Sequence, residues 1–173
     1  MPIPDIKVRE IQSFLKASSH QKYSVMFDIG LETGLRISDI LRLEVSGFRQ
    51  SMRIVEQKTG KERRIKFSSR LYKDIQRHIA SNHLKAGDFL VFRDGNHKST
   101  SLSRVQAYKT MKCAAVQCGV ENIGTHSLRK TFAVNHFKKH RDMAALQKIL
   151  NHKYITTTML YVFNTKNLSS VVF

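Results

Sequence analysis

Two stretches decide how the C-terminal half of this chain folds: HSLRKTF, residues 126–132, and LNHKYITTTMLY, residues 150–161. Their apolar residues recur at helical spacing, which predicts three short helices over residues 127–139, 142–150 and 157–163.

Caps and one turn residue set the expected limits of these helices. Asp142 and Thr156 have side chains suited to the N-cap position of the second and third helix. Asn151 tolerates the left-handed backbone conformation, so we expect it to end the second helix. His152 is then left at the turn.

Toward the N-terminus, the period of the apolar residues changes. Helical spacing runs through residues 8–15 and 25–29, and Gly34 is suited to end the second of these helices. Another short helix is expected around residues 37–41. The stretch MRIVEQKTGKERRIKF, residues 52–67, instead predicts two strands joined by a glycine turn, which is a basic β-hairpin.

Beyond the hairpin, helical spacing returns over residues 71–79, and FLVF, residues 89–92, predicts a third strand beside the hairpin. A long helix is expected over residues 103–118, with Gly119 as its stop. Four residues are predicted to form its apolar face: Val105, Tyr108, Met111 and Ala115. We therefore predict an α+β fold that is mainly helical, with a small antiparallel three-stranded sheet.

Composition limits the class of protein. The chain of 173 residues is of a size for one domain. Its 30 Lys and Arg outnumber 13 Asp and Glu, giving a net charge of +17, which attracts polyanions and above all nucleic acid. A merely soluble basic protein, or one that binds acidic lipid, has the same charge.

Cys113 and Cys118 are expected to be reduced thiols, and the sequence has no long apolar run or secretory leader.

The residue types of the two opening stretches suit phosphodiester chemistry. Cutting a phosphodiester without a metal ion needs a nucleophile, a proton donor for the leaving oxygen, and cations that neutralise the charge growing on phosphorus. Tyrosine, histidine, lysine and arginine candidates for these tasks are all present. His126 lies three residues before Arg129, on the same helix face, so both side chains can approach one phosphate.

Four motifs, in this order, resemble those of the tyrosine recombinases of the phage integrase family. They are GLRISD at 34–39, QKTGK at 57–61, HSLRKTF and LNHKYITTTMLY. In the family's closing motif the tyrosine follows the histidine by nine positions, as Tyr161 follows His152 here (161 − 152 = 9). The resemblance covers nearly the whole chain and implies the family's DNA breaking and rejoining fold.

The resemblance implies how the phosphate is held. Arg36 and Arg129 would clamp its non-bridging oxygens, because a guanidinium offers a planar fork of donors and stays charged. His126 would act as a base or a hydrogen-bond partner, and His152 would donate a hydrogen bond to a phosphate oxygen.

The resemblance also implies the covalent step. Tyr161 would attack phosphorus to form a 3′-phosphotyrosine, and Lys58 would protonate the departing 5′ oxygen. Such a linkage conserves the phosphodiester energy, so no metal, ATP or other cofactor is expected, and the sequence has no P-loop glycine pattern. Tyr154 is the rival nucleophile, and Lys61 is the rival of Lys58.

Other charged residues have candidate roles. Asp39 stands where the family more often has Glu, and one turn beyond Arg36 it can orient that arginine through an ion pair. His136 and His140, four apart on a helix, have the spacing of a zinc pair but lack an evident third ligand. Four basic residues are expected to contact DNA or to be simply solvated: Lys61, Arg63, Arg64 and Lys130.

The resemblance further implies a single catalytic domain over residues 1–173, without the N-terminal clamp domain usual in the family. The chain is then either a fragment or a naturally short recombinase. The expected partner is double-stranded DNA, on which the chain would form a homotetramer, with no membrane partner. The expected setting is the cytoplasm of a prokaryote, or a viral element.

Two other function classes share part of this pattern: a type IB topoisomerase, and a DNA-binding relative that has lost the reaction. The H-x-x-R box and the LNH motif resemble those of recombinases more closely, and the set of catalytic candidates is intact.

The apolar end of the chain, through Val171, Val172 and Phe173, is expected to dock on a groove of its own protomer or of a neighbouring one.

Overall fold

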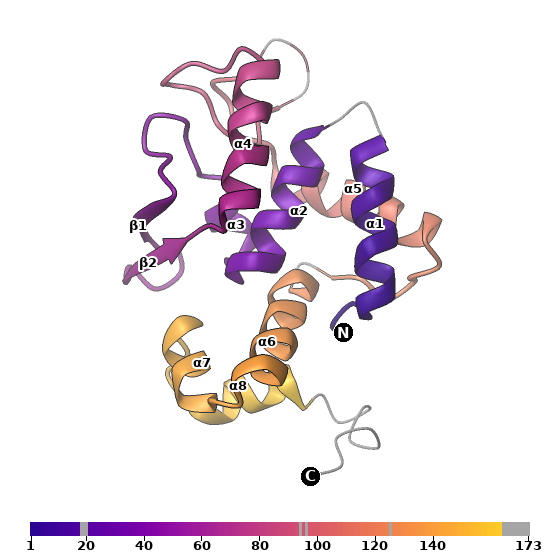
Figure 1. Cartoon of the computed structure of the whole chain (residues 1–173), viewed down its shortest axis with the longest axis vertical. Helices are drawn as coiled ribbons and strands as arrows, with labels where there is room; N and C mark the ends of the chain where they lie inside the picture. Colours follow the sequence, from indigo (N-terminus) through magenta and orange to yellow (C-terminus); the bar gives the residue numbers. More distant parts are fainter. Residues whose placement is uncertain (18–20, 94, 96, 125, 164–173) are drawn as a thin grey trace.

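The computed structural model describes residues 1–17, 21–93, 95, 97–124 and 126–163 (Figure 1). The expected docking segment at 171–173 lies outside these residues. Ten elements follow one another along the described chain: α1 (Asp5–Ala17), α2 (Gln21–Thr33), α3 (Ile37–Ile40), β1 (Ser51–Val55), β2 (Glu62–Lys66), α4 (Ser69–Ser81), α5 (Arg104–Gln117), α6 (Ser127–His140), α7 (Met143–Ile149) and α8 (Ile155–Val162).

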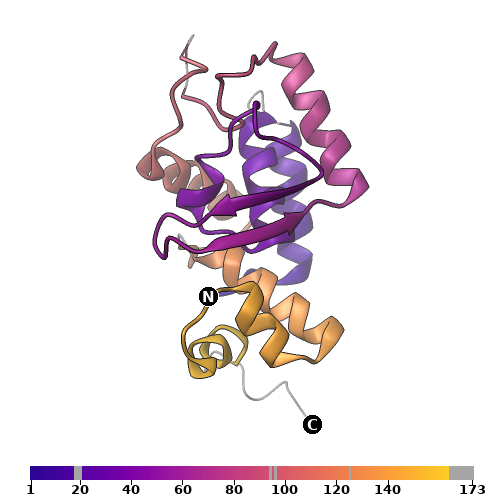
Figure 2. The same cartoon turned by 90° about the vertical axis from the view of Figure 1, so that its left-hand side faces the viewer.

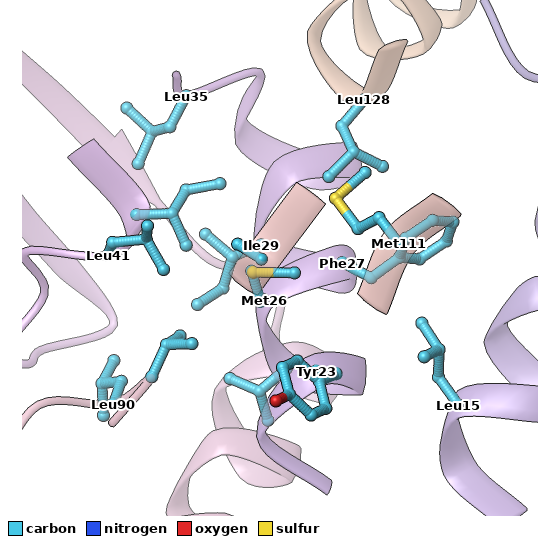
Figure 3. Packing of buried hydrophobic residues seen from close by; sticks show 14 of the residues in the cluster. Leu15, Tyr23, Met26, Phe27, Ile29, Leu35, Leu41, Leu90, Met111 and Leu128 are labelled. Carbon is cyan, nitrogen blue, oxygen red and sulfur yellow. The ribbon is translucent and has the colours of Figure 1, made fainter. Parts of the chain in front are cut away.

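Helix α2 is the centre of the main hydrophobic core. Nine of its 13 residues are buried, so it meets neighbours on nearly every side. It packs against α1, α3, α4, α5 and α6. Figure 3 shows Met26, Phe27 and Ile29 of α2 among side chains from other elements, including Met111 of α5 and Leu128 of α6.

Helices α6, α7 and α8 form a second, smaller unit at one end of the molecule (Figures 1 and 2). Its own core is built on Ala133, Leu146 and Leu150, against which Phe132 and Tyr161 pack. Because the start of α6 also contributes Leu128 to the main core, this helix joins the two units.

The sheet has two strands in the described part of the chain, not the three that the sequence predicts. Strands β1 and β2 pair antiparallel, with Ser51 opposite Lys66 and Val55 opposite Glu62. The stretch at 89–92 makes only isolated bridges, Glu44 to Phe89 and Phe92 to Ser101. Its backbone bonds to the loops at 43–45 and 98–102 instead of the hairpin, and its Leu90 and Val91 side chains lie in the main core.

Helix ends match the sequence pattern at several points. Gly34, Gly119 and Asn151 all have the left-handed φ expected of helix stops, at 62°, 72° and 50°. The Asp142 carboxylate accepts a hydrogen bond from the Ala145 amide at 2.9 Å, as an N-cap should.

Two helix predictions are wrong in detail. Helix α8 begins at Ile155, with Tyr154 and not Thr156 at its N-cap, and its buried Thr158 hydroxyl lies 3.0 Å from His152 Nδ1 in the turn before the helix. Helix α5 buries Ala107, Met111, Ala114 and Ala115, whereas Val105 is 63% exposed. No helix of the described residues is both long and apolar enough to cross a membrane.

Gly34 and Gly60 provide a matched test of the α2–α3 turn. Both have a left-handed φ, but an added Cβ at Gly34 would lie 2.8 Å from Phe132 Cγ, whereas at Gly60 it would meet nothing within 4 Å. Gly60→Ala should cost about 1–2 kcal/mol of stability, and Gly34→Ala should cost about 1–3 kcal/mol more through the clash. Urea denaturation measures both. Equal losses would show that the turn does not pack tightly on α6.

Candidate active site

Arg36 occupies the N-cap position of α3, directly after the turn that ends α2. Gly34 closes this turn by donating its amide to the Gly30 carbonyl at 3.0 Å, and Leu35 is buried beside it. The Arg36 side chain is only 13% exposed, and its Nη1 lies 2.6 Å from Glu56 Oε2. The arginine is therefore held by an ion pair at the edge of the core.

Arg129 lies on the first turn of α6 and is 1% exposed. Its Nη1 donates to the Gly34 carbonyl at 2.9 Å, and its Nη2 donates to the Leu150 carbonyl. Its Nε is buried without a hydrogen-bond partner. Burial, followed by the charges of Arg36 and Arg63, lowers the pKa of Arg129 to about 10, so it remains a cation at neutral pH.

His152 and Tyr161 are in contact. Their ring centroids are 5.0 Å apart in an edge-to-face arrangement. His152 Nδ1 lies 3.0 Å from Thr158 Oγ1 on α8, which fixes the orientation of the imidazole. Burial, then the charges of Arg129 and Arg36, lowers the pKa of His152 to about 4. Its neutral ring is therefore packed on the tyrosine at pH 7.

Tyr161 also lies close to cations. Lys130 Nζ is 5.6 Å from the centroid of its ring, within the range of a cation–π contact. Tyr161 is near enough to Arg129 to influence the pKa of that guanidinium. Tyr154 is exposed at the start of α8, where Lys153 covers its ring.

A cleft of about 890 Å³ lies beside Arg36. Arg36, Lys58 and His126 come to it from three separate parts of the chain. Partial burial, then the charges of Arg129 and Lys130, lowers the pKa of His126. Further lining residues that were not predicted as site residues include Arg42, Gln57, Arg104 and Tyr108. The sequence pattern alone does not separate these from ordinary surface residues.

The carboxylate paired with Arg36 is Glu56, not Asp39. Asp39 is buried, and its Oδ1 accepts a hydrogen bond from the Gln57 amide at 2.9 Å. Glu56 has no exposed surface. Although burial raises its pKa, the hydrogen bond and charge of Arg36 outweigh this effect, and the pKa of Glu56 is lowered.

The four residues expected to contact DNA lie in different settings. Lys61 and Arg64 are exposed on the hairpin, and Lys130 is half-buried beside Tyr161. Arg63 is 8% exposed and donates to the Thr33 carbonyl, so its placement fits a structural role and not the DNA contact that we expected. His136 and His140 stack with centroids 4.5 Å apart, but no cluster of three or more metal-binding side chains occurs within the described ranges.

The structure thus gathers the predicted catalytic candidates into two adjoining groups. Arg36, Lys58 and His126 line the cleft, while His152 and Tyr161 touch each other. Arg129 lies between the two groups, since its hydrogen bonds reach the turns before Arg36 and His152. A phosphate entering the cleft would meet the cations Arg36 and Lys58 and the imidazole of His126. Tyr161 and His152 lie in the adjoining group, so the two groups together hold the side chains needed for attack by tyrosine at phosphorus.

Comparison with known sequences agrees with this geometry. The model of the phage integrase family matches residues 5–167. The probable integrase/recombinase YoeC of Bacillus subtilis is 35% identical over 158 residues, which cover 90% of this chain and 84% of YoeC. Tyrosine recombinase XerD of Oceanobacillus iheyensis is 27% identical, and the alignment covers 95% of this chain and 59% of XerD. The chain thus spans most of one relative and little more than half of the other.

Comparison with solved structures places the fold among the same enzymes. A crystal structure of XerA recombinase superposes with a TM-score of 0.80 at 15% identity, covering 96% of this chain and 65% of that one. A XerH recombinase bound to its palindromic difH substrate superposes with a TM-score of 0.76 at 18% identity, covering 96% of this chain and 50% of that one. The family model, the sequence relatives, the fold and the two adjoining groups of side chains agree. The chain belongs to the phage integrase family of tyrosine recombinases.

Proposed function

We propose that this chain is a site-specific DNA recombinase that cleaves and rejoins DNA through a covalent 3′-phosphotyrosine at Tyr161. The observation that carries the proposal is the contact of Tyr161 with the neutral His152, beside the buried cation Arg129 and close to Lys130. Of the two candidate tyrosines, only Tyr161 has this setting; Tyr154 is exposed.

The proposed step balances without a cofactor. The Tyr161 phenol oxygen forms a bond to phosphorus while the bond from phosphorus to the 5′ oxygen breaks. The phenol proton passes to His126, whose lowered pKa keeps its ring neutral and able to accept it at pH 7. Lys58, on the turn of the hairpin that lines the cleft, gives a proton to the departing 5′ oxygen. Rejoining reverses these transfers.

The two arginines support the transition state in different ways. Arg36 lines the cleft and can donate directly to a phosphate oxygen. Arg129 is buried below it, with its Nη atoms bonded to carbonyls. It therefore acts through its fixed positive field and its unpartnered Nε, and by holding the turns that carry Arg36 and His152.

The proposed substrate is double-stranded DNA. Four cations line the cleft, Arg36, Arg42, Lys58 and Arg104, and the chain carries a net charge of +17. Several of the superposed structures are complexes with DNA, such as the Tn1549 transposon integrase with a circular intermediate DNA. We further propose that the chain is one catalytic domain and that it forms a tetramer on DNA, as the family resemblance implies.

Replacing Tyr161 by phenylalanine should abolish covalent attachment to DNA, because the attacking oxygen is removed. A nicked suicide substrate traps the adduct, and a denaturing gel detects it. Tyr154→Phe is the matched control and should form the adduct at the wild-type rate. Adduct formation that survives Tyr161→Phe but not Tyr154→Phe would show that the assignment is wrong.

Replacing Arg36 by lysine should slow adduct formation by about 100- to 1,000-fold, because lysine keeps the charge but loses the fork of donors. Arg53→Lys makes the same change on the exposed face of the hairpin and should alter the rate less than about twofold. Single-turnover kinetics on the suicide substrate measures both. A comparable rate for the two variants would exclude Arg36 as a phosphate ligand.

The lowered pKa of His152 predicts how stability depends on pH. Its ordinary pKa is 6.5, whereas in the folded chain it is about 4. Between these values the unfolded chain binds the extra proton and the folded chain does not, so His152 makes stability fall as pH drops from 6.5 to 4. His152→Asn should reduce the fall in Tm over this range, whereas His97→Asn, on an exposed loop, should not. Parallel Tm profiles for wild type and His152→Asn would contradict the buried, neutral imidazole.

A further inference from the structure

Glu56 is an unexpected residue in the basic hairpin. It lies two residues before Lys58 in the sequence, and yet it has no exposed surface. A buried carboxylate is unfavourable unless cations and hydrogen bonds compensate for its lost hydration. The groups that surround Glu56 therefore indicate why it is kept there.

The Glu56 side chain binds both the arginine of the site and the turn that carries the lysine. Its Oε2 accepts from Arg36 Nη1 at 2.6 Å and from Thr59 Oγ1 at 3.1 Å. Its Oε1 lies 3.7 Å from Arg63 Nη1. The same carboxylate thus contacts the half-buried Arg36 and Thr59, the turn residue that follows Lys58 in the sequence.

The backbone of Glu56 closes the same turn. Its amide donates to the Lys61 carbonyl at 3.0 Å, and its carbonyl accepts from the Gly60 amide at 2.8 Å. Lys58 lies inside the loop that these bonds close. The position of the lysine-bearing turn is therefore tied, through one residue, to the position of Arg36.

The surrounding positive charges explain why a neutral residue at position 56 could not replace Glu56. Three guanidinium groups gather here, since Arg36 and Arg63 both act on the pKa of Arg129. Two buried carboxylates, Glu56 and Asp39, face them, but Asp39 accepts from the Gln57 backbone. The ion pair that Arg36 makes within the described ranges is with Glu56.

We infer that Glu56 is a positioning residue for strand cleavage, whose carboxylate holds the Arg36 guanidinium and the Lys58 turn in one arrangement before DNA binds. A guanidinium has five N–H donors, so the contact with Glu56 leaves others for the phosphate. Because Arg36 is already held in place, the entropic cost of ordering its long side chain does not have to be met in the transition state. The inference rests on the proposed function, because the reaction it concerns is DNA cleavage.

The test compares Glu56→Gln with Glu62→Gln. Both remove one negative charge from the hairpin and keep the side-chain shape, but Glu62 is exposed. At saturating suicide substrate, Glu56→Gln should lower the rate of adduct formation by about 10- to 100-fold, while Glu62→Gln should stay within about twofold. Circular dichroism melting confirms that each variant is folded at the assay temperature.

A double-mutant cycle separates positioning from plain stabilisation. If Glu56 acts by holding Arg36, Glu56→Gln should change the rate less than about threefold in the R36K background, because the guanidinium that it positions is already absent. An equal loss in both backgrounds would show that Glu56 does not act through Arg36 and would overturn the inference. So would a faster reaction of Glu56→Gln, since it would mean that the carboxylate competes with the phosphate for Arg36.

A second variant decides the matter if Glu56→Gln does not fold. Glu56→Asp keeps the charge but withdraws the carboxylate by one methylene, so it should lose an intermediate part of the rate, and a wild-type rate would overturn the inference. No adduct with the wild-type chain would overturn the proposed function, and the inference with it. A wild-type adduct together with equal rates for Glu56→Gln and Glu62→Gln would overturn the inference alone.

Discussion

The hydrogen bonds of one buried guanidinium determine how the rest of the site is arranged. Arg129 is almost fully removed from water, which costs several kcal/mol unless its donors are satisfied. The carbonyls of Gly34 and Leu150 satisfy two of them, and these carbonyls belong to the turns that precede Arg36 and His152. The same interaction that makes the buried charge tolerable therefore sets the spacing of the proposed phosphate-binding groups, Arg36 and His152.

The charge of Arg129 also acts on the protonation of its neighbours. Burial first, and then the charge of Arg129, lowers the pKa values of His126 and His152, so both imidazoles are neutral near pH 7. A neutral His126 can accept a proton and a neutral His152 can donate one hydrogen bond. Glu56 opposes the local positive charge and keeps Arg36 beside Arg129 in spite of their mutual repulsion. The charge states at the site thus depend on a balance among these buried groups.

Much of this arrangement could be predicted from residue spacing. The stops at Gly34, Gly119 and Asn151 were predictable because few residues adopt a left-handed φ. The nine-residue step from His152 to Tyr161 spans the turn before α8 and nearly the whole of this helix, which brings the two rings together. Helix stops and short spacings depend on residues that are close in the sequence, so the sequence pattern predicts them.

The errors arise where distant parts of the chain decide the outcome. The stretch at 89–92 has a strand-like composition, but its backbone bonds to loops while Leu90 and Val91 pack in the main core. Arg63 and Glu56 resemble solvated hairpin charges in the sequence, yet the fold buries both against the turn that carries Arg36. Val105 shares the helical spacing of buried residues but faces outward beside the cleft. Periodicity does not reveal which face of an element meets the rest of the fold.

The central claim is that Tyr161 becomes linked to a 3′ phosphate, and the most direct measurement locates this bond chemically. Trypsin releases residues 154–166 of the covalent complex as one peptide that contains both candidate tyrosines. After nuclease digestion of the DNA, tandem mass spectrometry identifies the residue that carries the nucleotide and the end through which it is attached. The account predicts a 3′-linked nucleotide on Tyr161. A nucleotide on Tyr154, or a linkage through the 5′ phosphate, would contradict it.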